Sequence, residues 1–105
     1  MTADRIEQMR KMVRDLPEEP RTRYFLAHEL FRSKEWQEAA EHYEAYLRLS
    51  PGDEGAGWKN YGICLDRLGR RDDARAAYRS GIERALSHHH EALAGEMEEL
   101  LEQLD

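Results

Sequence analysis

The chain repeats itself at an interval of 35 residues, and this feature limits its fold more than any other. At that shift Ala39 aligns with Ala74, and Tyr43 aligns with Tyr78. A period of this length is typical of helical hairpins that stack, because each hairpin needs its neighbours to bury its apolar face. The same shift also pairs Ala27 with Gly62, Leu30 with Leu65, Arg32 with Arg67, Glu38 with Asp73, and Leu47 with Ile82.

The composition limits the kind of partner that the chain can bind. It has 105 residues, enough for one domain with a modest core. Its 22 acidic and 16 basic residues give a formal charge of -6, which argues against general binding to phosphate backbones or anionic membranes. The lone Cys64 excludes an internal disulfide and favours a reducing compartment. With neither a signal peptide nor an apolar stretch of membrane-spanning length, we expect a cytoplasmic protein.

Apolar residues at spacings of three and four predict an all-α chain of six helices. Pro17 is expected to end the first helix, and Pro20 to open the second, because a proline in the first turn loses no hydrogen bond. Ser33 is the expected N-cap of the third helix. The expected helices run from residue 3 to 16, from 20 to about 32, from the cap at 33 to 50, from about 54 to 69, from about 72 to 86, and from the histidine run to the last leucines.

The repeated positions resemble those of the tetratricopeptide repeat family, whose unit is a hairpin of helices A and B. Small residues at Ala27 and Gly62 allow the paired helices to approach closely. The first repeat departs from the family pattern at Arg23, where a large apolar residue is expected, and at Tyr46, where a small one is. The matching positions are Leu26, Ala27, Leu30, Trp36, Ala39, Tyr43, Leu47 and Pro51 in the first repeat, and Trp58, Tyr61, Gly62, Leu65, Gly69, Ala74, Tyr78 and Gly81 in the second.

This resemblance implies a right-handed stack of antiparallel hairpins within a single domain, residues 1–105. The helix at 1–16 looks like the B half of a degenerate repeat, and it would cover one end of two repeats at 20–52 and 54–86. The helix at 88–105 would cover the other end. Its glutamates lie among leucines, as expected of a terminal helix that hides one face and exposes the other.

The sequence offers little that could carry out catalysis or bind a metal. Cys64 lies among Tyr61 and Leu65, so a buried thiol is expected. His88, His89 and His90 are consecutive, so on a helix they would point about 100° apart rather than converge on one ion, and we expect them to form a solvated turn. The glycines at 52, 55 and 57 follow no predicted strand and indicate a turn rather than a dinucleotide site. We therefore expect no enzyme activity, no cofactor and no metal.

The family resemblance also implies a concave surface lined by the A helices. Its aromatic and basic residues suit a peptide with apolar anchors and carboxylates. Residues 21–34 include four basic residues and one acid, whereas residues 91–105 include six acids and no base, so the expected partner is an acidic segment with apolar anchors. The expected lining is Arg21, Tyr24, His28, Phe31 and Arg32 from the first repeat, and Lys59, Ile63, Asp66 and Arg67 from the second.

The sequence thus predicts a small, bacterial-type, non-enzymatic interaction adaptor of the tetratricopeptide repeat class. One alternative is self-association, in which the acidic last helix occupies the groove of a second copy to form a homodimer. A second alternative, with less support, is a metal- or nucleic-acid-binding protein on the same scaffold. The sequence leaves the partner, the pathway and the oligomeric state open.

Overall fold

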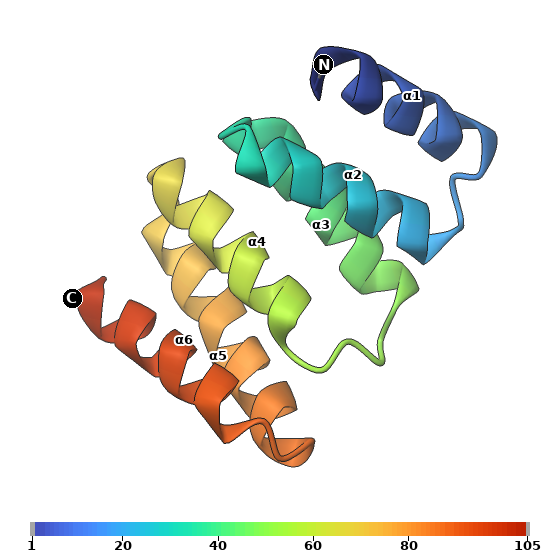
Figure 1. Ribbon diagram of the computed structural model, residues 1–105. Helices are drawn as coiled ribbons and strands as arrows, with labels where there is room; N and C mark the ends of the chain where they lie inside the picture. The colour runs from blue at the N-terminus through green and yellow to red at the C-terminus, as the bar shows by residue number, and fades with distance from the viewer. Residues whose placement is uncertain (1, 105) are drawn as a thin grey trace. The chain divides into compact units, whose positions relative to one another are not determined.

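The computed structural model describes residues 2–104, with side chains from residue 4 onwards; Met1 and Asp105, the predicted ends of the domain, lie outside it. The described residues form helices and turns, which confirms the predicted all-α class (Figure 1). The helices are α1 (Thr2–Asp15), α2 (Pro20–Arg32), α3 (Trp36–Leu49), α4 (Ala56–Arg67), α5 (Arg71–Ser87) and α6 (Glu91–Gln103).

The helices belong to two compact units, the first ending at Pro51 and the second beginning at Gly52. In the first unit α2 and α3 form a hairpin, and α1 packs on α2. In the second unit α4 and α5 form the corresponding hairpin, and α6 packs on α5. The helical hairpins predicted from the repeat are therefore present in both units, whereas the prediction of a single domain stays a prediction.

The turns after α2, α4 and α5 share one backbone design. In each, one residue has a positive φ, and the next donates its N–H to a carbonyl five residues earlier, which is the Schellman closure of a helix. Lysine and histidine take this conformation at two of the three turns, where glycine would be the usual choice. The residues with positive φ are Lys34 (62°), Gly69 (81°) and His89 (62°), and the closing bonds are Glu35 to Leu30, Arg70 to Leu65 and His90 to Ala85, at 2.8–2.9 Å.

Ser33 does not cap the third helix as the sequence predicts. It ends α2 instead, and its N–H donates to the carbonyl of Glu29. The N-cap of α3 is Glu35, whose side chain makes no capping hydrogen bond. The prediction was wrong because the Schellman closure takes up residues 33–35 before a new helix can begin.

The core of the first unit combines small and large side chains. Tyr43 is fully buried in α3, and α1 adds Ile6 and Val13 to the interior. Arg23, which departs from the family pattern, is accommodated because its guanidinium lies 3.2 Å from Nδ1 of His42 and 3.4 Å from the carbonyl oxygen of Pro17. The other buried residues of the unit include Leu26, Ala27 and Leu30 in α2, and Ala39, Ala40, Ala45 and Leu47 in α3.

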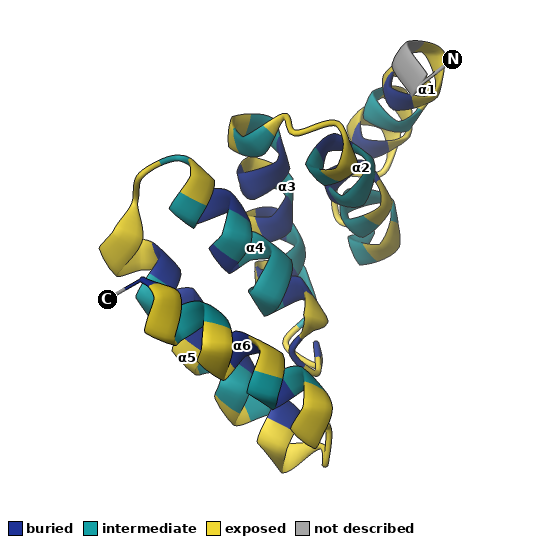
Figure 2. Ribbon diagram, turned by 60° about the vertical axis from the view of Figure 1, so that its left-hand side comes forward, coloured by how far each residue is buried: buried dark blue, intermediate teal, exposed yellow. Residues whose placement is uncertain are grey.

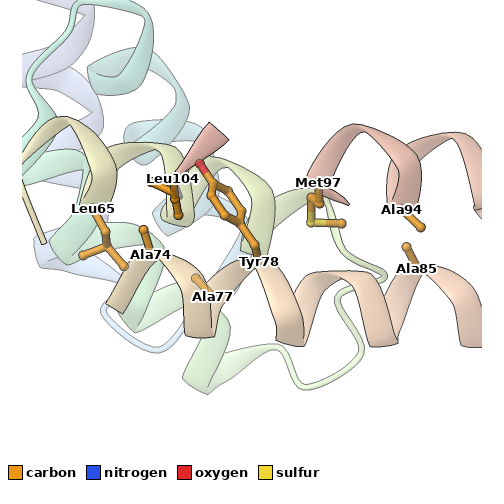
Figure 3. Close-up of a cluster of buried hydrophobic side chains, with 8 residues drawn as sticks. All are labelled: Leu65, Ala74, Ala77, Tyr78, Ala85, Ala94, Met97 and Leu104. Atoms are coloured by element: carbon orange, nitrogen blue, oxygen red, sulfur yellow. The ribbon is translucent and has the colours of Figure 1, made fainter. Parts of the chain in front are cut away.

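The core of the second unit lies between α5 and its two neighbours (Figure 3). Gly62 of α4 allows the ring of Tyr78 to approach its backbone, and Gly81 of α5 gives room to the side chain of Met97 from α6. Both large side chains are almost completely buried. The cluster consists of Leu65, Ala74, Ala77, Tyr78, Ala85, Ala94, Met97 and Leu104.

Candidate interaction surface

The first unit presents a row of three flat rings along one side of α2. Tyr24, His28 and Phe31 recur at helical spacings of four and three residues, so they lie on one face. The Tyr24 and His28 rings are 6.2 Å apart and within 4° of parallel, and the His28 and Phe31 rings are 6.3 Å apart and within 14°. Each of the three residues is only half-buried. We call this set the α2 ring ladder.

Aromatic residues of α3 pack against the α2 ring ladder and fix the orientation of its rings. Tyr43 meets the rings of both Tyr24 and Phe31 edge-on, at 5.9 Å and 6.2 Å. Tyr46 lies 5.0 Å from Tyr24, and Trp36 meets Phe31 edge-on at 5.5 Å. Edge-to-face contacts of this kind favour one ring orientation. The large residue at Tyr46, a departure from the family pattern, therefore supports the ladder.

An arginine stands at each end of the ladder. Arg21 has 82% of its side chain exposed and pairs with Glu19 at 3.2 Å, while Arg32 has 69% exposed and lies 3.7 Å from Glu29. Glu19 also caps α2, and hydrogen bonds from the backbone and side chain of Arg21 lower the pKa of its carboxyl. Both guanidinium groups are exposed and can turn to a ligand's carboxylate, while Glu19 keeps its hydrogen bond from the Arg21 N–H and Glu29, only 13% exposed, keeps its contact with Arg5 at 3.6 Å.

In the second unit the predicted lining residues of α4 are in different environments. Lys59 is half-buried and donates to Glu96 of α6 at 2.7 Å. Ile63 packs against the core of the unit, Asp66 is half-buried, and Arg67 is exposed. The structure thus gathers the five residues of the first unit on α2 and the four of the second on α4. A single groove formed by both sets stays a prediction.

The three histidines lie in the turn between α5 and α6 rather than on one helix, which changes how they are arranged. His88 ends α5, His89 has a φ of 62°, and His90 precedes α6. His90 Nε2 lies 2.6 Å from Glu54 Oε1, and His88 Nδ1 lies 3.8 Å from Glu54 Oε2. The histidines thus lie in an exposed turn, as the sequence predicts, and because the helix ends at His88 two of them reach Glu54.

These contacts favour the ionised form of Glu54. The hydrogen bond with His90, followed by the electrostatic interaction with His88, lowers the pKa of the Glu54 carboxyl. Among residues 4–104, no group of three or more histidine, cysteine, aspartate or glutamate side chains is placed to hold a metal ion. The contacts of Glu54 with His90 and His88 fasten the α5–α6 turn to the loop before α4.

Cys64 is fully buried, as its apolar neighbours predict. Burial raises the pKa of its thiol to about 12. The thiolate is the nucleophilic form of cysteine, so this side chain is poorly suited to nucleophilic chemistry at neutral pH.

Asp53 is a structural residue of the loop before α4 that the sequence analysis missed. It is 8% exposed, and its carboxylate accepts hydrogen bonds from the N–H groups of Gly55 at 3.0 Å and Gly57 at 3.2 Å. Such amides at a helix start could otherwise bind an anion. In this chain the carboxylate of Asp53 takes the place of such an anion. The signal in the sequence is an aspartate two residues before a glycine at a helix start, the pattern of an Asx turn.

Replacement of Asp53 by alanine is expected to lower the free energy of unfolding by about 2 kcal/mol, because two buried N–H groups lose their acceptor. Urea denaturation followed by circular dichroism measures this loss. Asp53→Asn keeps one acceptor oxygen and should lose less than half as much. An alanine variant as stable as the parent chain would contradict the role given to this carboxylate.

Comparison with known proteins shows the family of the chain. The model of the tetratricopeptide repeat matches residues 3–54 and again residues 26–88. The chain belongs to the tetratricopeptide repeat family. The first match includes α1, in agreement with its interpretation as part of a degenerate repeat. No curated protein matches the chain.

Tetratricopeptide repeats generally mediate protein–protein interactions, and they typically serve as non-catalytic scaffolds. The sequence predicts a protein that binds other proteins, and this general prediction agrees with the family. In the described part of this tetratricopeptide repeat protein, no helix combines the length and the hydropathy needed to cross a bilayer.

Proposed function

We propose that the chain is a non-enzymatic adaptor that binds an acidic, apolar-anchored segment of a partner protein along α2. The observation that carries this proposal is the α2 ring ladder with an arginine at each end. Exposed aromatic rings and arginine commonly provide most of the binding energy of protein interfaces. Because α3 already holds the rings in place, little side-chain freedom is lost when a ligand binds.

The spacing of the two arginines specifies the ligand further. Arg21 and Arg32 are 11 positions apart on one helix, which corresponds to about 16 Å at the helical rise of about 1.5 Å per residue. An extended chain advances about 3.3 Å per residue and covers this distance in about five residues. The preferred segment therefore carries carboxylates about five residues apart, with apolar side chains between them to lie on the rings.

We propose that Lys59, Ile63, Asp66 and Arg67 of α4 extend this surface for a longer partner. Lys59 contacts Glu96 of the same unit, and Arg67 is exposed, so charge reversal at Arg67 tests whether a partner carboxylate binds this part of α4. Binding at α2 does not depend on this extension, because the ladder and both of its arginines lie within the first unit.

The packing of α6 favours a separate partner over self-association. A segment that binds the ladder needs apolar side chains as well as acids. In α6 the large apolar residues Met97 and Leu104 are buried in the core of the second unit, and Leu93, Leu100 and Leu101 pack against it. Its exposed residues are largely glutamates, which provide charge without apolar anchors.

The test uses a fluorescein-labelled peptide of sequence Gly-Asp-Leu-Ala-Phe-Leu-Asp-Gly, with fluorescence anisotropy as the readout. A matched peptide with asparagine at both aspartates is expected to bind about tenfold more weakly. Raising the salt from about 50 mM to about 500 mM should remove most of this difference. Equal affinity for the two peptides at low salt would contradict the proposal. Sizing chromatography of the same preparation shows whether the chain forms dimers instead.

A further inference from the structure

The second unit has a surface hollow of about 710 Å³ that shares no residue with the proposed peptide surface. It lies between the start of α4 and the first turns of α6, which are at the same end of this unit (Figure 1). The α5–α6 turn, which is exposed (Figure 2), contributes His89 and His90 to its lining. All of the lining residues except Leu93 are exposed, so it is an open depression that suits a side chain of a partner rather than an enclosed small molecule. Its lining is Glu54, Ala56, His89, His90, Glu91, Ala92, Leu93 and Glu96.

The lining combines an apolar part with acidic groups from two chain segments. Ala56, Ala92 and Leu93 provide the apolar part. Glu54 comes from the loop before α4, and Glu91 and Glu96 come from α6.

The carboxylates differ in how they are engaged. Glu54 is held by His90 and His88, and Glu96 accepts from Lys59 at 2.7 Å. For Glu91, no ion pair or side-chain hydrogen bond is found within residues 4–104. Three carboxylates therefore line the hollow, two of them in contact with Lys59 or with the imidazoles of His88 and His90, and the third, Glu91, remains available to a cationic ligand.

We propose that this hollow binds an arginine side chain, flanked by small apolar residues, on a segment of a partner protein. The long stem of arginine can cover apolar surface while its charged end reaches polar groups. Its planar guanidinium matches carboxylates bidentately, and charge complementarity therefore selects arginine over neutral residues of similar length. The adaptor would then have two surfaces of opposite preference: an acidic segment along α2 and a basic segment in the second unit.

The experiment is a titration of ¹⁵N-labelled full-length chain with the peptide acetyl-Ala-Leu-Arg-Ala-Leu-amide. A matched peptide carries citrulline, which has the same length and nearly the same shape but no charge, because a urea carbonyl replaces one nitrogen of the guanidinium. The arginine peptide is expected to shift the amide signals of Ala56, Ala92 and Leu93, and to bind at least about fivefold more tightly than the citrulline peptide.

Glutamate-to-glutamine variants test whether the arginine peptide binds in the hollow. The triple variant Glu54→Gln, Glu91→Gln and Glu96→Gln should weaken binding of the arginine peptide about tenfold, from three exposed charge pairs together. The matched control is Glu98→Gln, Glu99→Gln and Glu102→Gln, which removes the same charge from exposed positions of α6 outside the hollow and should change affinity less than twofold. The double variant Glu91→Gln and Glu96→Gln keeps the Glu54 contacts and should show most of the loss.

Equal losses in the hollow and control variants would mean that only the overall charge matters, and would overturn the proposal. So would equal affinity for the arginine and citrulline peptides, or amide shifts confined to other residues. The result is independent of the proposed function, because charge reversal of Arg21 and Arg32 should leave affinity for the arginine peptide unchanged while it abolishes binding of the acidic one.

Discussion

Replacement of Gly62 by leucine is expected to lower the free energy of unfolding by about 3 kcal/mol, the upper part of the range for overpacked cores. A Cβ atom at this position would lie 2.5 Å and 2.7 Å from two ring carbons of Tyr78. These distances are shorter than van der Waals contact. The ring has little room to move because Tyr78 is 1% exposed and packed on every side. The larger side chain must therefore force α4 away from α5.

Urea denaturation of Gly62→Leu, Gly62→Ala and Gly95→Ala gives a graded comparison. Gly62→Ala should destabilise the chain less than leucine does. Gly95, in the middle of α6, has open space where its Cβ would be, so Gly95→Ala should stabilise the chain by about 0.5 kcal/mol through the higher helix propensity of alanine. Unfolding midpoints for both Gly62 variants equal to that of the parent would contradict the assigned packing of this hairpin.

Charge reversal on α2 is expected to weaken binding of the acidic peptide about 30-fold at low salt. Arg21→Glu and Arg32→Glu remove two attractive contacts and place like charges beside the ligand's carboxylates, so the total effect exceeds that of two lost surface pairs. Adding Arg67→Glu should weaken binding further only for a longer peptide that reaches α4. Anisotropy titrations over a range of salt concentrations measure both effects.

The matched control is Arg48→Glu with Arg79→Glu, which changes the net charge equally at exposed positions of α3 and α5. It should weaken binding less than threefold, through the overall field alone. Circular dichroism should show unchanged helicity in both double variants. A control that loses as much affinity as the α2 variant would mean that the ring ladder is not the binding surface.

The helices could be predicted from the sequence because each buries an apolar stripe whose spacing is local information. Their ends were harder to predict. Glu54 was expected to begin α4, whereas the helix begins at Ala56, because the carboxylate of Asp53 accepts from the N–H groups of Gly55 and Gly57. Ser33 was misassigned because a lysine adopts the left-handed backbone at residue 34, where the sequence carries no glycine to indicate it.

The candidate surface was predicted in part. The family pattern placed Tyr24, His28 and Phe31 on one face, and the structure has their rings stacked. The pairing of Lys59 with Glu96 could not be predicted, since these residues are far apart in the sequence and meet only when α6 packs back on the second unit. The meeting of His90 with Glu54 depends in the same way on tertiary structure and on the unusual backbone of His89.

The two tryptophans lie in different units, so their fluorescence can report the unfolding of each unit separately. The chain has two tryptophans, Trp36 in α3 of the first unit and Trp58 in α4 of the second. A chain with Trp58 replaced by phenylalanine emits tryptophan fluorescence from the first unit alone, and one with Trp36 replaced emits from the second alone. In repeat proteins, neighbouring units unfold together only when the interface between them is strong relative to their own stabilities. The separation between the two fluorescence transitions, compared with circular dichroism of the whole chain, therefore reports the coupling free energy between the halves.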